Sequence, residues 1–376
     1  MEAVVQGKIW ANSGDSHFIE PDEAWKSLPP ALAERMPRSV KDADGRNETV
    51  TIDGQSFRRR MPSPKQQEFL EMARRPGLGD VAARLADLDN EGIWAEVVYP
   101  SLGMWNSMYR DPVLVREAMR VSNDWVKEQL VDASTRLVPT AQVSMLSITD
   151  AIEELERTRQ MGFKCVFMPC EPPKALPHYN DESWEPFWAA CERTGMVLAF
   201  HIGTEPIDHQ AGEVIGVAFR GAGGAVINHT HAAISVLRVT MLMVASGVLD
   251  RHPDLKMLVS ESGASWVPFL GDRMDEAYRQ HGEWSYPKLS SSPKEILYRQ
   301  VYASFQHDVT AIPTMTAMGY QNVMWGSDYP HLEGTFGHTQ ETLHELFDGV
   351  DDAVRRRITT GSFLELFPDV GVGPPD

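Results

Sequence analysis

Residues that commonly bind metal ions cluster near the start of the chain. Asp15, His17 and Glu20 fall within six residues. Asp15 and His17 are two positions apart, so their side chains point to the same side where the backbone is extended. Carboxylate and imidazole groups without thiolates suit iron, manganese or zinc. The stretch therefore predicts one part of a metal site, whose remaining ligands must come from later segments.

Three further candidate ligands each follow a short apolar run. They are His201 after residues 196–200, Glu261 after 255–259, and Asp328 after 322–325. If these runs are parallel strands of a barrel, their carboxyl ends open onto the same face. We therefore expect Asp15, His17, Glu20, His201, Glu261 and Asp328 to converge there as metal ligands, with Asp328 and Glu261 also taking part in catalysis.

The apolar runs alternate with amphipathic helical segments. The predicted strands are residues 8–13, 95–99, 136–143, 164–168, 196–200, 255–259, 301–305 and 322–325. Near-continuous apolar runs of this length are typical of parallel strands covered on both faces. Between them, a helix is indicated where Trp184, Phe187 and Trp188 share one helical face ahead of Gly195. Eight strand–helix units without a dinucleotide-binding glycine motif predict an α/β fold, a closed (β/α)₈ TIM barrel.

Two insertions interrupt this alternation in a single predicted domain, residues 1–367. Residues 22–79 follow the first strand, are rich in proline and contain a predicted hairpin over 49–57. Residues 202–235, rich in Gly and His, are expected to form a long loop after the fifth strand. Loops at this face vary most among barrels, so either insertion is a candidate lid. Residues 368–376 are expected to be a disordered tail.

The composition argues against several classes of partner. The 376 residues include 53 acidic and 35 basic side chains, a net charge of −18. Nucleic-acid binding needs clustered positive charge, and a membrane span needs about 20 apolar residues in succession, and neither is present. The start of the chain does not resemble a signal peptide, and three cysteines form no disulfide framework. We expect a cytoplasmic enzyme with a small-molecule substrate, which can also form a homo- or hetero-oligomer.

Several of these segments together resemble a known family. Residues 15–21 (DSHFIEP), His201, residues 261–266 (ESGASW) and residues 325–331 (WGSDYPH) are similar to the amidohydrolase-related (amidohydrolase 2) family. This family includes the aminocarboxymuconate-semialdehyde decarboxylase-like enzymes. The resemblance implies a TIM barrel with a divalent metal at its C-terminal mouth. It also implies that Asp15, His17, His201 and Asp328 are ligands.

One position departs from the family pattern. Where the family's decarboxylases end the sixth strand with a catalytic histidine, this chain has Glu261. An ionised carboxylate there would repel an anionic substrate, and it would need a strongly raised pKa to donate a proton. Four carboxylates with two histidines match the ligand set of di-iron and di-manganese proteins. This donor count favours two ions per chain, iron ahead of manganese or zinc.

The reaction expected from such a centre is oxygen activation. The first expectation is a monooxygenase that hydroxylates a small molecule or an acyl group and takes electrons from a donor. The alternative is hydrolysis of an amide, ester or lactone by metal-bound hydroxide, with Asp328 as the base. Non-oxidative decarboxylation comes third. Five further residues are candidates for the pocket or for contacts around the ligands: His229, His231, Tyr302, His307 and His331.

Overall fold

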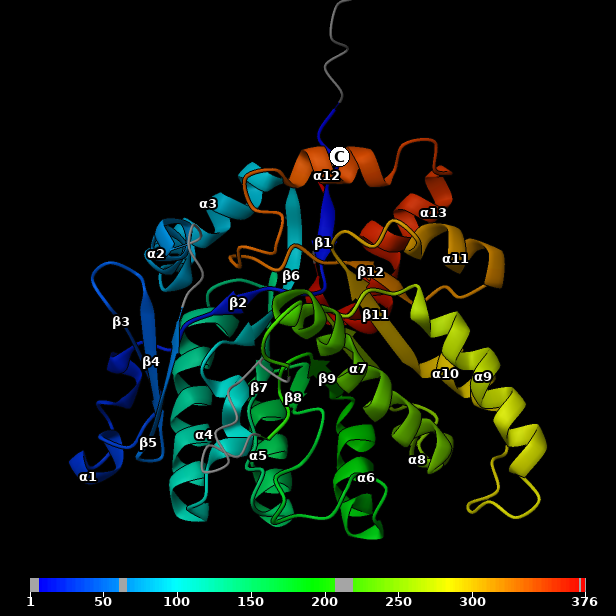
Figure 1. The fold of residues 1–376 in the computed structure, drawn as a ribbon, viewed down its shortest axis with the longest axis horizontal. Coiled ribbons are helices and arrows are strands. Elements are labelled where there is room, and N and C mark those ends of the chain that lie inside the picture. Colours follow the sequence, from blue (N-terminus) through cyan, green and yellow to red (C-terminus); the bar gives the residue numbers. More distant parts are fainter. Residues whose placement is uncertain (1–6, 61–65, 207–218, 372, 376) are drawn as a thin grey trace, which may run out of the picture.

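The computed structural model describes residues 7–60, 66–206, 219–371 and 373–375, and its centre is a nearly closed barrel of eight parallel strands (Figure 1). In order around the barrel these are β1 (Ala11–Ser13), β6 (Ile93–Pro100), β7 (Leu137–Ala141), β8 (Cys165–Met168), β9 (Val197–His201), β10 (Met257–Ser260), β11 (Val301–Phe305) and β12 (Val323–Trp325). Each predicted strand overlaps one of them. The (β/α)₈ prediction is therefore confirmed.

The barrel closes where the first and last strands meet. The Gly14 N–H donates to the Trp325 carbonyl over 2.8 Å, and the Asp328 N–H donates to the Asp15 carbonyl over 3.0 Å. A short strand, β2 (His17–Phe18), continues from β1 and pairs with β6. The backbone on either side of the closure thus carries predicted metal ligands from both ends of the chain.

Helices surround the barrel (Figure 1). They are α3 (Val81–Glu91), α4 (Pro112–Val126), α5 (Ile148–Gln160), α6 (Glu185–Thr194), α7 (Gly224–Ala245), α8 (Val248–Arg251), α9 (Trp266–His281), α10 (Pro293–Gln300), α11 (Ala311–Met318), α12 (Thr339–Leu346), α13 (Asp352–Arg356) and α14 (Ser362–Leu366). Their ends follow the sequence signals. The Asp111 side chain caps α4 ahead of Pro112, and Gly195 ends α6 in the left-handed conformation.

Shorter turns fill the connections. The 3-10 turns are η1 (Asp22–Trp25), η2 (Pro76–Leu78), η3 (Gly103–Met108), η5 (Glu182–Trp184) and η8 (Pro368–Val370), and π turns are found at η4 (Lys127–Val131) and η7 (Arg357–Gly361). The tail predicted to be disordered thus begins with the 3-10 turn η8, in which Val370 is buried.

The insertion after the first strand is a small unit packed on the side of the barrel (Figure 1). It holds α1 (Pro30–Ala33), a three-stranded antiparallel sheet of β3 (Arg38–Lys41), β4 (Asn47–Ile52) and β5 (Gln55–Arg60), and α2 (Gln66–Ala73). The hairpin predicted over 49–57 is the β4–β5 pair. Val50 and Ile52 pack with Leu114 and Val115 of α4, which fixes the sheet against the barrel.

The predicted loop over 202–235 was wrong in its second half. Residues 207–218 lie outside the described part, but Gly224 begins α7, which continues to Ala245. Asn228, His229 and Thr230 have low helix propensity, and this obscured the start of the helix. Of the helices described, none is both long and apolar enough to cross a lipid bilayer.

Candidate metal centre

Four of the predicted ligands meet in the mouth of the barrel. Asp15, His17, His201 and Asp328 are all buried. His17 Nε2 lies 3.3 Å from Asp328 Oδ1 and 3.7 Å from Asp15 Oδ1, and His201 Nε2 lies 3.4 Å from Asp15 Oδ1. These residues form overlapping groups whose ligand atoms lie within 4.8 Å of one another. These ligands come from β2, from the end of β9, and from the segments just beyond β1 and β12, as the sequence predicted for residues at strand ends.

Glu261 and His331 complete the cluster. Glu261 Oε2 lies 3.4 Å from His201 Nε2, and His331 Nδ1 lies 2.9 Å from Asp328 Oδ1. The His331 ring also stacks on His17 at 4.1 Å between centroids. Glu261 and Asp328 both have positive φ, 59° and 54°, which is rare for residues other than glycine and is often found at functional sites.

The polar atoms of this cluster fit a divalent cation. Within the described part of the chain, both carboxylate oxygens of Asp15 and of Asp328, both ring nitrogens of His17, and Nε2 of His201 make no hydrogen bond of good geometry, although the histidines of the cluster lie close to these carboxylates. Leaving so many buried polar atoms without partners is costly, because burial removes their water. A cation among them would satisfy several at once. Oxygen and imidazole donors suit manganese, iron or zinc.

The orientation of His201 supports a ligand role. Its Nδ1 lies 2.9 Å from the carbonyl oxygen of Ile202, which only accepts hydrogen bonds. Nδ1 therefore carries a proton, and in the neutral ring the lone pair is on Nε2, which faces Asp15 and Glu261. A backbone carbonyl that fixes the tautomer in this way is common behind metal-binding histidines.

Opposite charges face each other within the cluster. Burial and the nearby His331 lower the pKa of His17 to about 3. Burial opposes protonation of His201 and His331 too, but Asp15 raises the pKa of His201 to about 10 and Asp328 raises the pKa of His331 to about 9. Two imidazolium groups thus face the carboxylates of Asp15 and Asp328. Burial and the Asp328 charge raise the pKa of Glu261 to about 8.

Arg84, on α3, supports the ligand-bearing backbone from behind. Its Nη1 donates to the His17 carbonyl over 2.7 Å, its Nη2 donates to Ser16 Oγ over 3.0 Å, and its Nε pairs with the buried Glu96. The guanidinium also lies 5.0 Å from the centre of the Tyr329 ring. Sequence reasoning missed Arg84, because no local motif marks a helix residue that reaches under a strand.

Glu20 is not part of the cluster. Its two carboxylate oxygens accept the backbone N–H groups of Leu102 and Gly103 over 3.0 and 2.8 Å. The predicted ligand role is corrected accordingly: Glu20 anchors the segment after β6.

Most of the other candidate pocket residues lie elsewhere. The Tyr302 hydroxyl donates to Glu365 of α14, at the end of β11 away from the mouth. His229 and His231 lie on α7, the first exposed and the second packed against Phe219. His307 is exposed and its ring lies 6.1 Å from that of His338. Of the five, the structure places only His331 in the cluster.

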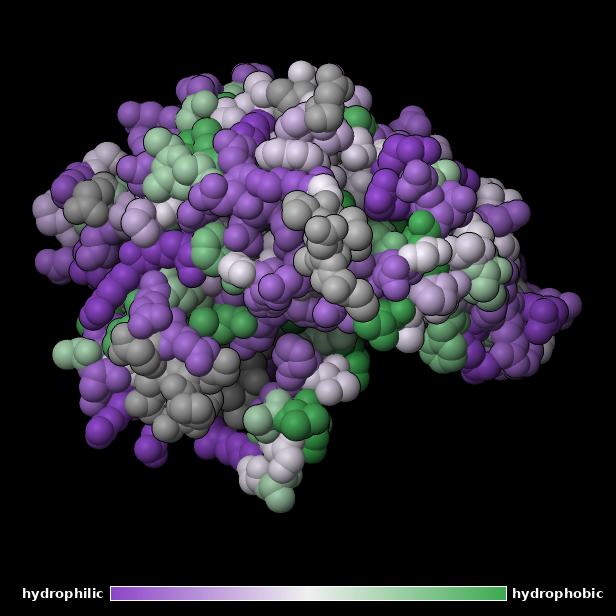
Figure 2. Space-filling view, turned by 90° about the horizontal axis from the view of Figure 1, so that it is seen from above, coloured by the Kyte–Doolittle hydropathy of each residue, from purple (hydrophilic) through white to green (hydrophobic). Residues whose placement is uncertain are grey.

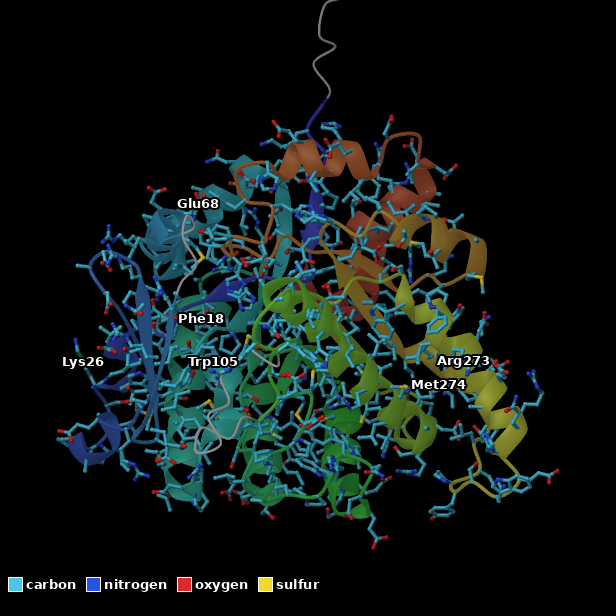
Figure 3. All side chains as sticks on the ribbon, in the orientation of Figure 1. Phe18, Lys26, Glu68, Trp105, Arg273 and Met274 are labelled. Carbon is cyan, nitrogen blue, oxygen red and sulfur yellow. The ribbon has the colours of Figure 1, made fainter. Side chains whose placement is uncertain are left out.

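A cavity of about 160 Å³ opens beside the cluster. Its wall includes His17 and His331 from the cluster, Lys41 from the insertion, and apolar side chains that include Met104 and Trp105. Figure 3 shows Trp105 between the insertion sheet and the barrel, and its ring contacts Phe57 of β5. The insertion therefore forms part of the pocket wall. Whether it opens and closes as a lid remains a prediction.

Tyr99, at the end of β6, was also missed. Its ring centroid lies 5.1 Å from that of His201, and its hydroxyl is 2.9 Å from Ser260 Oγ. The signal was available, because Tyr99 ends a predicted strand just as His201 does. A criterion based on charged ligands does not select an aromatic residue at a strand end.

Comparison with known proteins identifies the family. The family model described as Amidohydrolase matches residues 17–362, so the chain belongs to the amidohydrolase family. A gamma-resorcylate decarboxylase from Polaromonas sp. strain JS666 is 24% identical over 274 residues, which cover 68% of this chain and 78% of the relative.

Solved structures support the same fold. An amidohydrolase from Mycobacterium avium subsp. paratuberculosis K-10 superposes with a TM-score of 0.76, at 20% identity over 96% of this chain and all of the other. A dihydroxybenzoic acid decarboxylase from Polaromonas sp. JS666, solved with bound manganese and the inhibitor 2-nitroresorcinol, has a TM-score of 0.67, at 16% identity over 96% of this chain and 97% of the other.

These relatives correct the expected reaction. The prediction of an oxygen-activating monooxygenase was wrong, because the gamma-resorcylate and dihydroxybenzoic acid relatives are both decarboxylases. The preference for iron and the count of two ions also lack support, since the related structure contains manganese. The donor count that suggested two ions included Glu20, which the structure removes from the cluster.

Proposed function

We propose that this protein is a metal-dependent, non-oxidative decarboxylase of a small aromatic hydroxy-acid. The observation that carries the proposal is the buried set of Asp15, His17, His201 and Asp328, whose unpartnered atoms face one another beside a small cavity. The decarboxylase relatives supply the reaction class. In this reaction the bond from the ring carbon to the carboxyl carbon breaks, the ring carbon takes up a proton, and carbon dioxide leaves. No oxidant or electron donor is needed.

The four buried residues would hold one manganese ion per chain. A bound divalent cation would act as a Lewis acid toward the substrate's carboxylate or hydroxyl oxygen. His201 presents Nε2 because Ile202 holds Nδ1, and Asp328 is fixed by the backbone bond from its own N–H to Asp15. The protein therefore contributes a preorganised ligand set, which needs little rearrangement to bind the ion.

The cavity beside the cluster suits an aromatic ring. Leu78, Leu102, Met104 and Trp105 supply apolar surface, while His17 and His331 border it on the side of the cluster. Such a pocket excludes water around the ring and leaves the polar groups of the substrate to meet polar side chains. Lys41, whose Nζ lies 3.1 Å from Glu48, adds a charged pair to the wall.

Glu261 is the group we assign to proton delivery. The sequence alone weighed against this role, because a carboxyl group donates protons at neutral pH only if its pKa is raised. Without a bound ion, burial and the Asp328 charge raise the pKa of Glu261 to about 8, which brings it into the range of a general acid at neutral pH. The side chain is 15% exposed, and its Oε2 lies 3.4 Å from His201 Nε2, beside the proposed metal ligands.

The test is a product assay without oxygen. Manganese-loaded protein is incubated anaerobically with gamma-resorcylate and with 2-hydroxybenzoate, and carbon dioxide and the phenolic products are measured. We expect carbon dioxide release from at least one of them, with deuterium entering the ring when the solvent is D₂O. Asp328→Asn is the inactive control. Lactone or ester hydrolysis without any decarboxylation would overturn the proposal in favour of a hydrolase.

A further inference from the structure

Glu261, the residue assigned to proton delivery, has an unusual backbone conformation. Its φ is 59°, in the left-handed region that residues other than glycine rarely adopt. It directly follows β10, whose last paired residue is Ser260. A conformation of this kind persists only where the surrounding structure determines it. The contacts on either side of Glu261 therefore decide where its carboxyl group points.

On the amino-terminal side, the barrel itself holds Ser260. The Ser260 hydroxyl is buried and donates to the Gly14 carbonyl over 2.9 Å. The Tyr99 hydroxyl lies 2.9 Å from the same Oγ, and because the Ser260 proton is directed to Gly14, Tyr99 is the donor. The residue before Glu261 is therefore fixed to two other strand ends.

On the carboxyl-terminal side, the contact comes from the loop after β11. Asp308 lies three residues beyond β11, and its Oδ2 accepts the N–H groups of Ala264 and Ser265 over 3.0 and 2.9 Å. Ser265 is the N-cap of α9, and its own side chain makes no capping hydrogen bond. Asp308 therefore caps α9 from a neighbouring loop, which leads into α11 beside α9 (Figure 1).

The Asp308 carboxylate is also fixed within its own loop. Its Oδ1 accepts the Thr310 N–H over 3.1 Å and the Thr310 hydroxyl over 2.6 Å. Burial raises the pKa of Asp308, but the hydrogen bonds from Thr310, Ser265 and Ala264 outweigh burial and lower the pKa. The group is therefore ionised at neutral pH. One oxygen is held by its own loop, and the other reaches the segment after Glu261.

A solvated surface charge is the ordinary role of an aspartate in so acidic a chain. Figure 2 shows a largely hydrophilic outer face, as expected for a protein with 53 acidic residues. Asp308 differs, because it is half-buried and both of its oxygens accept hydrogen bonds. Gly263 permits its close approach, since a Cβ at this position would lie 3.0 Å from Asp308 Oδ2 and Gly263 has a φ of 70°.

We propose that Asp308 is a positioning residue for Glu261, which holds the segment from Glu261 to Ser265 so that the Glu261 carboxyl stays beside His201. Glu261 Oε2 lies 3.4 Å from His201 Nε2 in this arrangement. The inference rests on the proposed role of Glu261 in proton delivery. It adds a residue that is outside the groups of described residues able to hold an ion.

Kinetics and hydrogen exchange of the manganese-loaded chain test this role. Asp308→Ala removes the carboxylate, and we expect kcat for decarboxylation to fall about 10- to 100-fold, because a displacement of about 1 Å in a reacting group can cost that much. Manganese affinity should stay unchanged, since none of the four buried ligands lies on this segment. Exchange of the amide protons of Ala264 and Ser265, followed by mass spectrometry, should become faster.

Two further variants separate positioning from a general loss of stability. Asp308→Asn keeps one oxygen that can accept both N–H groups, so it should restore kcat and slow exchange to near the wild-type values. Asp250→Ala is the matched control, because Asp250 also accepts an N–H and a hydroxyl, both from Ser290, but lies on α8, ahead of β10 and away from the mouth. It should leave kcat and the exchange of residues 264 and 265 unchanged.

A double-mutant cycle shows whether Asp308 acts through Glu261. If it does, adding Asp308→Ala to Glu261→Gln should lower kcat little further, whereas independent effects would multiply. Multiplying effects, or an Asp308→Ala variant with wild-type exchange at Ala264 and Ser265, would overturn the inference. A wild type that releases no carbon dioxide would instead overturn the decarboxylase proposal, and the exchange measurement, which needs no turnover, would still decide whether Asp308 holds this segment.

Discussion

The side chains of His17 and Asp328 approach to 3.3 Å, although one comes from the first strand region and the other from beyond the last strand. The backbone joins the same segments, because the His17 N–H donates to the Tyr329 carbonyl over 2.6 Å. The metal ligands are therefore also the residues at which the barrel closes. A bound ion would link the two ends of the chain in addition to its part in the reaction.

This arrangement predicts that metal removal lowers stability. An ion that binds only the folded state stabilises it by mass action, by about 2.7 kcal/mol at a hundredfold excess over its dissociation constant. We expect dialysis against a chelator to lower the melting temperature by on the order of 5 °C. Differential scanning calorimetry with and without manganese measures this, and magnesium is the control ion. Identical melting temperatures in both states would contradict the prediction.

Arg84 is predicted to position His17. Arg84→Lys keeps the charge but loses the simultaneous bonds to the His17 carbonyl and Ser16. Partners behind the ligands commonly contribute 10- to 100-fold to metal affinity, and we expect a loss of roughly that size in a manganese titration.

Arg157→Lys provides the matched control for Arg84. Arg157 also holds a carboxylate pair, Glu154 and Asp124, but on α5, outside the cluster. The Arg157→Lys variant should bind manganese as tightly as the wild type, even if the substitution lowers the stability of the fold. Equal affinities for the Arg84→Lys variant and the wild type would show that Arg84 serves the fold alone.

Manganese affinity is predicted to rise with pH. The pKa of His201 is raised to about 10 in the metal-free protein, so its ring is protonated at neutral pH and must lose a proton to bind an ion. Lower pH therefore favours the proton and higher pH favours the metal. His17, with a pKa of about 3, is already neutral and adds nothing to this dependence. Calorimetric titrations between pH 6 and 8 should show affinity rising about tenfold per pH unit, and a flat profile would argue against His201 as a ligand.

Glu261 is predicted to affect the reaction more than metal binding. Glu261→Gln removes the carboxyl proton but keeps the size of the side chain. General acids typically contribute 10²- to 10⁴-fold, so we expect kcat to fall by at least about 100-fold while manganese affinity changes little. If affinity falls together with kcat, Glu261 is instead a ligand, as its place near Asp15 and Asp328 would allow.

The sequence predicted the barrel because the strands are continuous apolar runs and the helices carry clear end signals, such as Asp111 and Gly195. The same logic placed His17, His201 and Asp328 together, since strand ends share one face. The same argument gave a wrong prediction for Glu20. Glu20 lies beyond the strand, where the backbone turns and the alternation of side chains no longer predicts their direction. The sequence did not predict the role of Arg84 either, because Arg84 contacts residues that are distant from it in the sequence.

The reaction class was harder to predict than the fold. A count of carboxylates does not distinguish a metal ligand from a carboxylate that accepts backbone hydrogen bonds. Because Glu20 was counted as a ligand, the count suggested a second ion. The raised pKa of Glu261 could not be predicted from the sequence, because it depends on burial and on the charge of Asp328 in the folded chain. Both errors favoured oxygen chemistry over decarboxylation.

Manganese titration of the metal-free chain, wild type beside Asp328→Asn, tests the convergence of these ligands most directly. Electron paramagnetic resonance of free manganese gives the number of ions bound and their affinity. We expect close to one ion per chain in the wild type and an affinity at least about 100-fold weaker in the variant, whose fold is checked by circular dichroism. A wild type that binds no manganese, or a variant that binds it equally well, would contradict the metal centre described above.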